Sequence, residues 1–222
     1  WSGTSNVSWK VAIPGHGHGS PSVLGPHAFI ATADRTAETQ TLFCFERRTG
    51  KTAWETIVHR GPLEKRGNTK SSQASCTPAC DGQKVYVNFL HKGHVVTSAL
   101  DLSGRIVWQT TVTRYQTHQG FSSSPCLFGS LVLVSADNRA GGAVVAISRA
   151  TGKVAWRQSR PKKANYTSPI VLRVAGKDQA LMVGTNLVSS YDPRTGKKLW
   201  EIDGATTECV TSVVTDGTRI FT

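Results

Sequence analysis

Histidine and acidic residues at a few irregular positions are the best candidates for chemistry in this 222-residue chain. His16 and His18 are two residues apart, so on an extended strand both side chains point to the same face. Imidazole nitrogens are common metal ligands, and His118 or Glu208 could complete a site from elsewhere in the chain. The alternative interpretation is that the glycine-rich stretch around His16 and His18 is a solvated loop.

No motif for covalent or metal-assisted catalysis is present. The chain has no GxSxG elbow, no HExxH pair and no glycine-rich phosphate loop before a helix. The five cysteines are never adjacent, and an extended strand would hold Cys76 and Cys80 about 13 Å apart, too far for a disulfide. We therefore assign no catalytic residue and expect the protein not to be an enzyme.

The chain is strongly basic, with 26 Lys and Arg against 14 Asp and Glu and a net charge of +12. Much of this charge recurs in one turn of a repeated unit, which predicts solvated turns around a rim; two denser clusters, Lys65-Arg66 with Lys70 and Arg160 with Lys162-Lys163, are expected in loops. This distribution does not favour a nucleic-acid partner. No run of 18 apolar residues predicts a membrane-spanning helix.

A stretch that recurs along the chain indicates the fold that positions the candidate histidine and acidic residues. It consists of a turn glycine, a basic residue and, four residues after the glycine, a tryptophan. Four copies end at Trp54, Trp108, Trp156 and Trp200, and a degenerate fifth copy ends at Trp9. Successive tryptophans are 45, 54, 48 and 44 residues apart. A period of roughly 45 residues is typical of a repeat architecture.

Each unit contains four short strands. The first strand follows a Ser-Pro or Thr-Pro pair, as at Ser124-Pro125, and Asp-Gly pairs such as Asp81-Gly82 predict hairpins. Because no segment has a 3.6-residue apolar period, the pattern predicts an all-β β-propeller of four-stranded antiparallel blades. The expected blades of this single domain are 14–57, 70–111, 118–158 and 162–202. We expect partial blades at 1–13 and 205–222 and the chain to be part of a ring of 7–8 blades. The alternative is a five-bladed ring with one incomplete blade.

These repeats resemble the pyrroloquinoline-quinone (PQQ)-like β-propeller repeat of quinoprotein alcohol dehydrogenases and of the outer-membrane assembly lipoprotein BamB. The resemblance implies that each tryptophan docks between neighbouring blades, a structural role for Trp9, Trp54, Trp108, Trp156 and Trp200. It also implies a bacterial protein in the periplasm, associated with the envelope, or secreted.

Residues just before each innermost strand are expected at the mouth of the central channel. They differ between blades and converge on one axis: His16, His18, Gln73, His118, Asn165, Tyr166 and Glu208. We interpret them as a binding site for a protein partner or small ligand, with a metal site at His16, His18 and His118 as a further hypothesis. The other histidines, His27, His59, His91 and His94, are expected in exposed turns or loops.

Two functions follow from the resemblance. The leading one is a non-catalytic binding or assembly scaffold without a cofactor. The alternative is a PQQ-dependent dehydrogenase, whose family uses an adjacent cysteine pair, a calcium ion held by acidic and amide side chains, and a catalytic Asp. This chain has neither adjacent cysteines nor an Asp-rich cluster near the expected channel, which weakens the alternative.

Overall fold

The computed structural model describes residues 2–65 and 68–222, and every regular element among them is a β-strand. Strands form because β-branched and aromatic residues alternate with polar ones between turn residues. Asx turns reverse the chain between strands. At one such turn the Asp81 carboxylate accepts the N–H groups of Gln83 and Lys84.

Sixteen strands form four four-stranded antiparallel sheets, which we call blades 1 to 4. Blade 1 contains β1 (Ser22–Leu24), β2 (His27–Asp34), β3 (Thr39–Glu46) and β4 (Thr52–Arg60). Blade 2 contains β5 (Ala79–Cys80), β6 (Lys84–His91), β7 (His94–Asp101) and β8 (Ile106–Arg114). Blade 3 contains β9 (Cys126–Phe128), β10 (Leu131–Ser135), β11 (Gly142–Ser148) and β12 (Val154–Arg160). Blade 4 contains β13 (Ile170–Val174), β14 (Lys177–Gly184), β15 (Leu187–Tyr191) and β16 (Lys198–Asp203).

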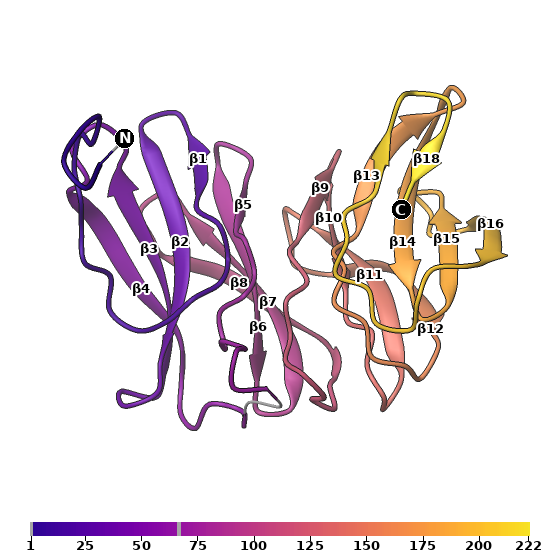
Figure 1. The fold of residues 1–222 in the computed structure, drawn as a ribbon, viewed down its shortest axis with the longest axis horizontal. Helices are drawn as coiled ribbons and strands as arrows, with labels where there is room; N and C mark the ends of the chain where they lie inside the picture. The colour runs from indigo at the N-terminus through magenta and orange to yellow at the C-terminus, as the bar shows by residue number, and fades with distance from the viewer. Residues whose placement is uncertain (1, 66–67) are drawn as a thin grey trace.

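The strands within each blade pair in chain order, and the blades follow one another across the molecule (Figure 1). A fifth, two-stranded sheet is formed by β17 (Val214–Thr215) and β18 (Ile220–Phe221). Of the expected partial blade 1–13, residue 1 lies outside the described residues, and residues 2–13 contain no strand. The predicted all-β fold with four-stranded antiparallel blades is confirmed.

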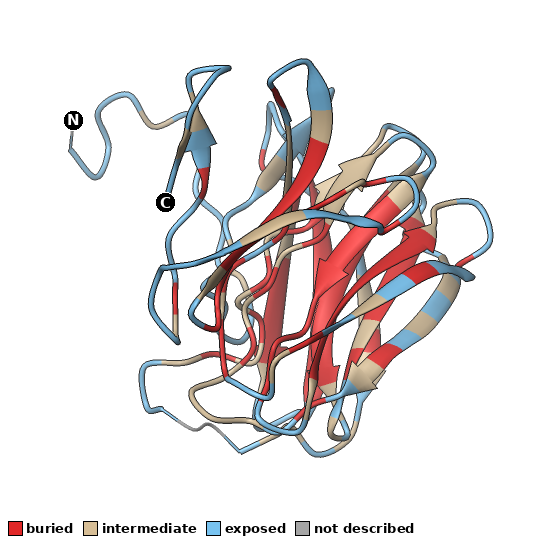
Figure 2. Cartoon of the chain, turned by 90° about the vertical axis from the view of Figure 1, so that its right-hand side faces the viewer, coloured by how far each residue is buried: buried red, intermediate tan, exposed pale blue. Residues whose placement is uncertain are grey.

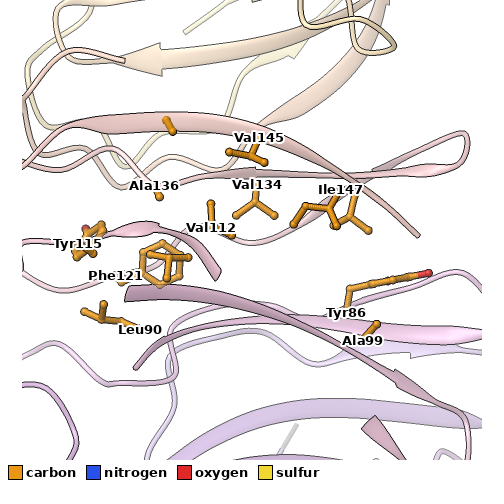
Figure 3. Close-up of a cluster of buried hydrophobic side chains, with 13 residues drawn as sticks. Tyr86, Leu90, Ala99, Val112, Tyr115, Phe121, Val134, Ala136, Val145 and Ile147 are labelled. Carbon is orange, nitrogen blue, oxygen red and sulfur yellow. The ribbon is translucent and has the colours of Figure 1, made fainter. Parts of the chain in front are cut away.

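The hydrophobic cores lie between neighbouring blades. Between blades 2 and 3, Tyr86 and Ala99 from one side pack with Val134, Val145 and Ile147 from the other (Figure 3). Burial concentrates in the middle strands, whereas turns and outer strands are exposed (Figure 2). Because a fully buried Val or Ile side chain contributes about 1.5–3 kcal/mol, these interfaces supply much of the stability.

A bulge in the outer strand comes just before the tryptophan in each of the four blades. In blade 3, Trp156 is the partner of Ala146 and Val154 is the partner of Ile147, so Ala155 is the extra residue. The same shift precedes the tryptophan in the other three blades, and the residue opposite is always small: Cys44, Ala99, Ala146 or Ser190. A bulge bends and twists its strand, and in blades 1 to 3 it presents the indole to the glycine turn of the next blade.

Four tryptophans contact the glycine turn of the following blade. Their indole Nε1 atoms donate hydrogen bonds of 2.8–3.1 Å to turn carbonyls, from Trp9 to Arg47, Trp54 to Leu102, Trp108 to Arg149 and Trp156 to Pro193. The rings cover Gly50, Gly104, Gly152 and Gly196, all of which have positive φ. Trp200 differs, because its Nε1 donates to the Gln179 side chain of its own blade at 2.7 Å.

The Ser/Thr-Pro pairs form a second set of contacts between blades. The Ser20 N–H donates to Thr77 Oγ1 at 3.0 Å, the Thr77 N–H to Ser124 Oγ at 2.9 Å, and the Ser124 N–H to Ser168 Oγ at 2.8 Å. We call this series the hydroxyl belt. Proline keeps the preceding residue extended, which fixes each hydroxyl toward the blade before it.

His27, expected in a surface loop, is the first residue of β2 and is partly buried. Three other residues expected in loops or at the exposed surface also lie elsewhere. Arg160 ends β12 with its side chain fully buried, His59 lies within β4, and His91 ends β6. In each case the expectation was wrong because a strand end packs against the next blade, which local sequence does not reveal. Arg66, expected in the other basic cluster, lies outside the described residues.

Candidate functional site

The segments before the innermost strands run extended and line the pockets described below. Between positions 71 and 78 burial alternates strictly: Ser72, Ala74 and Cys76 are buried, whereas Gln73 and Ser75 are partly exposed. An extended chain places successive side chains on opposite faces, so every second residue faces away from the core. The same segments of several blades together make a polar surface.

A polar cluster joins three of these segments. His118 Nε2 lies 3.2 Å from Glu208 Oε1, and Arg139 Nη2 lies 3.9 Å from the same oxygen. Tyr166 Oη accepts the backbone N–H of Gln119 at 3.2 Å. Burial, followed by the nearby Glu208 carboxylate, raises the pKa of Tyr166, so the phenol stays protonated and can donate. Positive, neutral and negative groups therefore meet at one point.

A pocket of about 340 Å³ opens beside this cluster. Its polar wall comes from Gln119, Tyr166 and Glu208, and its apolar wall from Phe121 and Val210. Tyr115 packs edge-on against Phe121, with ring centroids 5.4 Å apart, and holds that wall in place. Ligand sites commonly combine apolar walls with a few converging polar groups.

A second pocket of about 500 Å³ shares Ser75, Ser122, Tyr166 and Val210 with the first. His18, which precedes blade 1, and Ser168 of the hydroxyl belt also line this second pocket. The two pockets thus form one groove along the channel-facing segments. Ser75, Ser122, Tyr166 and Ser168 in this groove carry hydroxyl groups, which can both donate and accept hydrogen bonds.

Asn165 has a different environment from its neighbour Tyr166. It is buried, its Nδ2 donates to Asp137, Thr167 and Val183, and its Oδ1 accepts the Cys209 N–H at 3.0 Å. The same Asp137 pairs with the buried Arg160 at 3.1 Å. Asn165 thereby joins a buried network between blades 3 and 4, and its polar atoms are already engaged.

The remaining predicted residues lie apart from the groove. His16 is exposed, and its backbone bridges to Ala33 of blade 1. Gln73 uses its side-chain Nε2 to bind the Glu64 carbonyl at 3.0 Å. No group of three His, Cys, Asp or Glu side chains suited to a metal ion occurs within residues 2–65 and 68–222. The structure therefore brings His118, Tyr166 and Glu208 together, with His18 on the adjoining edge.

Sequence reasoning missed Arg139 and Val210. Arg139 lies in the turn between β10 and β11, far in sequence from the Ser-Pro marker of its blade. Val210 lies two residues after the predicted mouth residue Glu208, and the alternation of the extended segments is the signal that could have placed it. Arg139 had no such signal.

The groove offers hydrogen-bonding groups beside an apolar wall. Glu208 and Tyr166 can accept and donate hydrogen bonds to a molecule whose apolar part lies on Phe121 and Val210. The other acidic side chains of the described blades are largely committed: Asp137 pairs with Arg160, while Asp101 and Asp192 accept N–H groups within their own turns.

The comparisons with known proteins agree on the architecture. A family model described as outer membrane protein assembly factor BamB matches residues 2–120 and again 103–221. The quinohemoprotein alcohol dehydrogenase from Comamonas testosteroni aligns with a TM-score of 0.62 and 15% identity, over 86% of this chain and 35% of that protein. A europium-containing methanol dehydrogenase aligns with a TM-score of 0.53 and 13% identity, over 89% and 53%.

The chain therefore spans between about a third and about half of the length of these two structures. At such identities the likeness concerns the fold alone. A search of curated protein sequences gives no significant match. No helix within the described residues is long and apolar enough to cross a membrane.

Proposed function

The chain belongs to the BamB-like family of PQQ-type β-propellers, and from this premise we propose that it is a non-catalytic scaffold. It binds a protein partner or a small ligand in the channel-facing groove, outside the cytoplasm in the cell envelope or as a secreted protein. The observation that carries the proposal is the pocket of about 340 Å³, in which Tyr166, Glu208 and Gln119 converge beside an apolar wall.

The electrostatics of the groove favour a ligand with both polar and apolar parts. The Arg139 guanidinium lies 3.9 Å from the Glu208 carboxylate and balances its charge, so the pocket does not select strongly for either sign of charge. Hydroxyls of Ser75, Ser122 and Tyr166 provide directional hydrogen bonding along the groove. A peptide loop or a small organic molecule with several hydrogen-bonding groups fits this chemistry.

The test is to fill the groove with a side chain. Val210 is 81% exposed and lines both pockets, so Val210→Trp should block them without disturbing the core. Val107, 43% exposed on the outer strand β8, gives the matched control Val107→Trp. A fragment library is screened by ligand-observed NMR, and hits are located by backbone shift changes near Tyr166.

We expect saturable binders whose affinity falls at least tenfold in Val210→Trp and is unchanged in Val107→Trp. Equal binding to both variants, or no binder whose shifts fall on the groove, would contradict the proposal.

A PQQ-dependent dehydrogenase is the alternative function, supported by the fold of the two dehydrogenase structures. The described acidic residues do not form the expected calcium cage, and the sequence lacks adjacent cysteines. Adding PQQ and Ca²⁺ to the protein and measuring absorbance after gel filtration separates the two functions. A stoichiometric quinone spectrum that persists through the column would favour the dehydrogenase.

A further inference from the structure

Two histidines stack on each other at the junction of blades 1 and 2. His59 of β4 and His91 of β6 have ring centroids 4.5 Å apart and an interplanar angle of 12°. Phe89 packs edge-on against His59, with centroids 5.8 Å apart. The contact thus joins strand ends from two different sheets through imidazole rings.

The junction contains buried polar atoms without partners. His59 Nε2, His91 Nδ1 and Gln40 Oε1 are buried, and no described group forms a hydrogen bond with any of them. Gln40 is fully buried and is the Cα partner of His59 on β3, which places the two side chains on one face of the sheet. Unpaired buried polar atoms are uncommon and costly, so their grouping here calls for a function.

The parallel rings do not suit a metal ion. In-plane nitrogen lone pairs of two stacked imidazoles run side by side instead of converging on one centre. A titrating contact fits better, because burial of both rings favours the neutral forms and a proton on either ring would bring an uncompensated charge into the junction.

The charged groups around the rings strengthen this effect. Lys92 acts on both rings, and Glu64 acts on His91, while its carboxylate accepts the Gly93 N–H at 2.5 Å. Burial, then His91 and Lys92, lowers the pKa of His59 from 6.5 to about 4. Burial and Lys92 also lower the pKa of His91, and Glu64 opposes them in part. His94, the register partner of His91, is exposed.

We propose that the stacked His59–His91 pair is an acid-sensitive joint between blades 1 and 2. While both rings are neutral the pair holds the strand ends together, and protonation of either ring opens the contact in mildly acidic solution.

The joint is connected to the channel side of the molecule. Gln40 Nε2 donates to the carbonyls of Gln73 and Leu90, both at 3.0 Å. Gln73 and Leu90 line a small cavity next to Phe121, which also forms a wall of the larger pocket. Opening the joint therefore loosens the support behind that pocket.

The sign of the pH effect follows from the lowered pKa. An unfolded His59 binds a proton near pH 6.5, whereas the folded one does so only near pH 4. The stability from the neutral pair is therefore complete above about pH 6.5 and is lost as the pH falls toward about 4. Most carboxylates are still ionised between pH 7 and 5, so this window isolates the histidines.

Native-state hydrogen exchange by mass spectrometry tests the joint. Exchange is measured at pH 7 and pH 5 and corrected for the intrinsic rates of the amides. We expect protection at the ends of β4 and β6 to fall on the order of tenfold at pH 5. Protection at the Arg160 end of β12, which packs through an ion pair instead, should change little.

Three variants complete the test. His59→Phe/His91→Phe keeps a stacked aromatic pair that cannot titrate, and its protection should not depend on pH. His94→Gln removes an exposed histidine from the same turn and should keep the wild-type dependence. His59→Gln, in a chain with His91 intact, replaces the double variant if that one does not fold, and should weaken the dependence. An equal pH effect in the non-titrating variant, or no loss of protection at pH 5, would overturn the proposal.

Discussion

Gly152 meets two separate constraints at one position. Its φ is +72°, and a Cβ added there would lie 2.8 Å from the Trp108 ring. Gly176 has almost the same φ, +73°, but nothing lies within 4 Å of its added Cβ. Comparing substitutions at Gly152 and Gly176 therefore separates the free-energy cost of backbone strain from the cost of displacing the Trp108 ring.

We predict that Gly152→Ala lowers the free energy of unfolding by about 2–4 kcal/mol, because strain and the lost Trp108 contact add together. Gly176→Ala should lower it by about 1–2 kcal/mol, from strain alone. Urea unfolding followed by tryptophan fluorescence measures both. Equal losses in the two variants would show that the indole contact contributes little.

The buried ion pair of Asp137 and Arg160 shows how a residue's role depends on partners distant in sequence. Arg160 Nη1 donates to Ser189 at 2.8 Å, and Nη2 donates to Asp137, Thr185 and the Gly184 carbonyl. In sequence Arg160 stands beside Lys162 and Lys163 and resembles a solvated basic cluster. Its environment comes from blades 3 and 4 together, so no local pattern could have identified it.

The hydroxyl belt acts at the scale of the element, since each bond joins the innermost segment of one blade to the next. The Ser/Thr-Pro pairs were predicted only as markers of strand starts. Their hydroxyls accept hydrogen bonds from backbone N–H groups at the inner edge that have no partner in a neighbouring strand. Removing such a hydroxyl would leave the N–H group without a hydrogen bond.

Ser124→Ala should therefore destabilise the protein by about 1 kcal/mol and speed exchange of the Thr77 amide at least fivefold. Thr77→Ser is the matched control, because it keeps the hydroxyl that accepts the Ser20 N–H. Amide exchange resolved by NMR measures both effects. Unchanged protection of the Thr77 amide in Ser124→Ala would mean that the hydroxyl does not hold the segment.

At the scale of the whole molecule, periodicity carried most of the information. The spacing of Trp54, Trp108 and Trp156 predicted the blades because every copy repeats the same turn and the same outer strand. The groove was harder to predict, because its residues come from the irregular segments between blades. His118, Tyr166 and Glu208 could be grouped from their position before inner strands, whereas Arg139 enters from a turn that has no marker.

The repeated turns also set how the molecule responds to strong acid. Hydrogen bonds, led by the Ser103 hydroxyl, lower the pKa of Asp101 to about 2, and backbone N–H groups of Arg194 and Thr195 help to lower the pKa of Asp192 against the opposing effect of burial. Unfolded aspartates titrate near pH 3.9, so the folded carboxylates remain ionised to lower pH. The stability they contribute is present above about pH 4 and is lost as the pH falls toward 2.

The double variant Asp101→Asn/Asp192→Asn tests this contribution. An asparagine oxygen still accepts the N–H groups of the turn but does not titrate, so the fold is kept while the proton linkage is removed. We expect the melting temperature of the wild type to fall more steeply between pH 4.5 and 2.5 than that of the variant. Asp34→Asn is the control, since its carboxylate binds N–H groups in a single hairpin outside the glycine turns. Asp101 and Asp192 occupy equivalent turns of blades 2 and 4, so each single variant should remove part of the difference in how steeply the melting temperature falls with pH. The same slope of melting temperature against pH in the wild type and in every variant would refute the linkage.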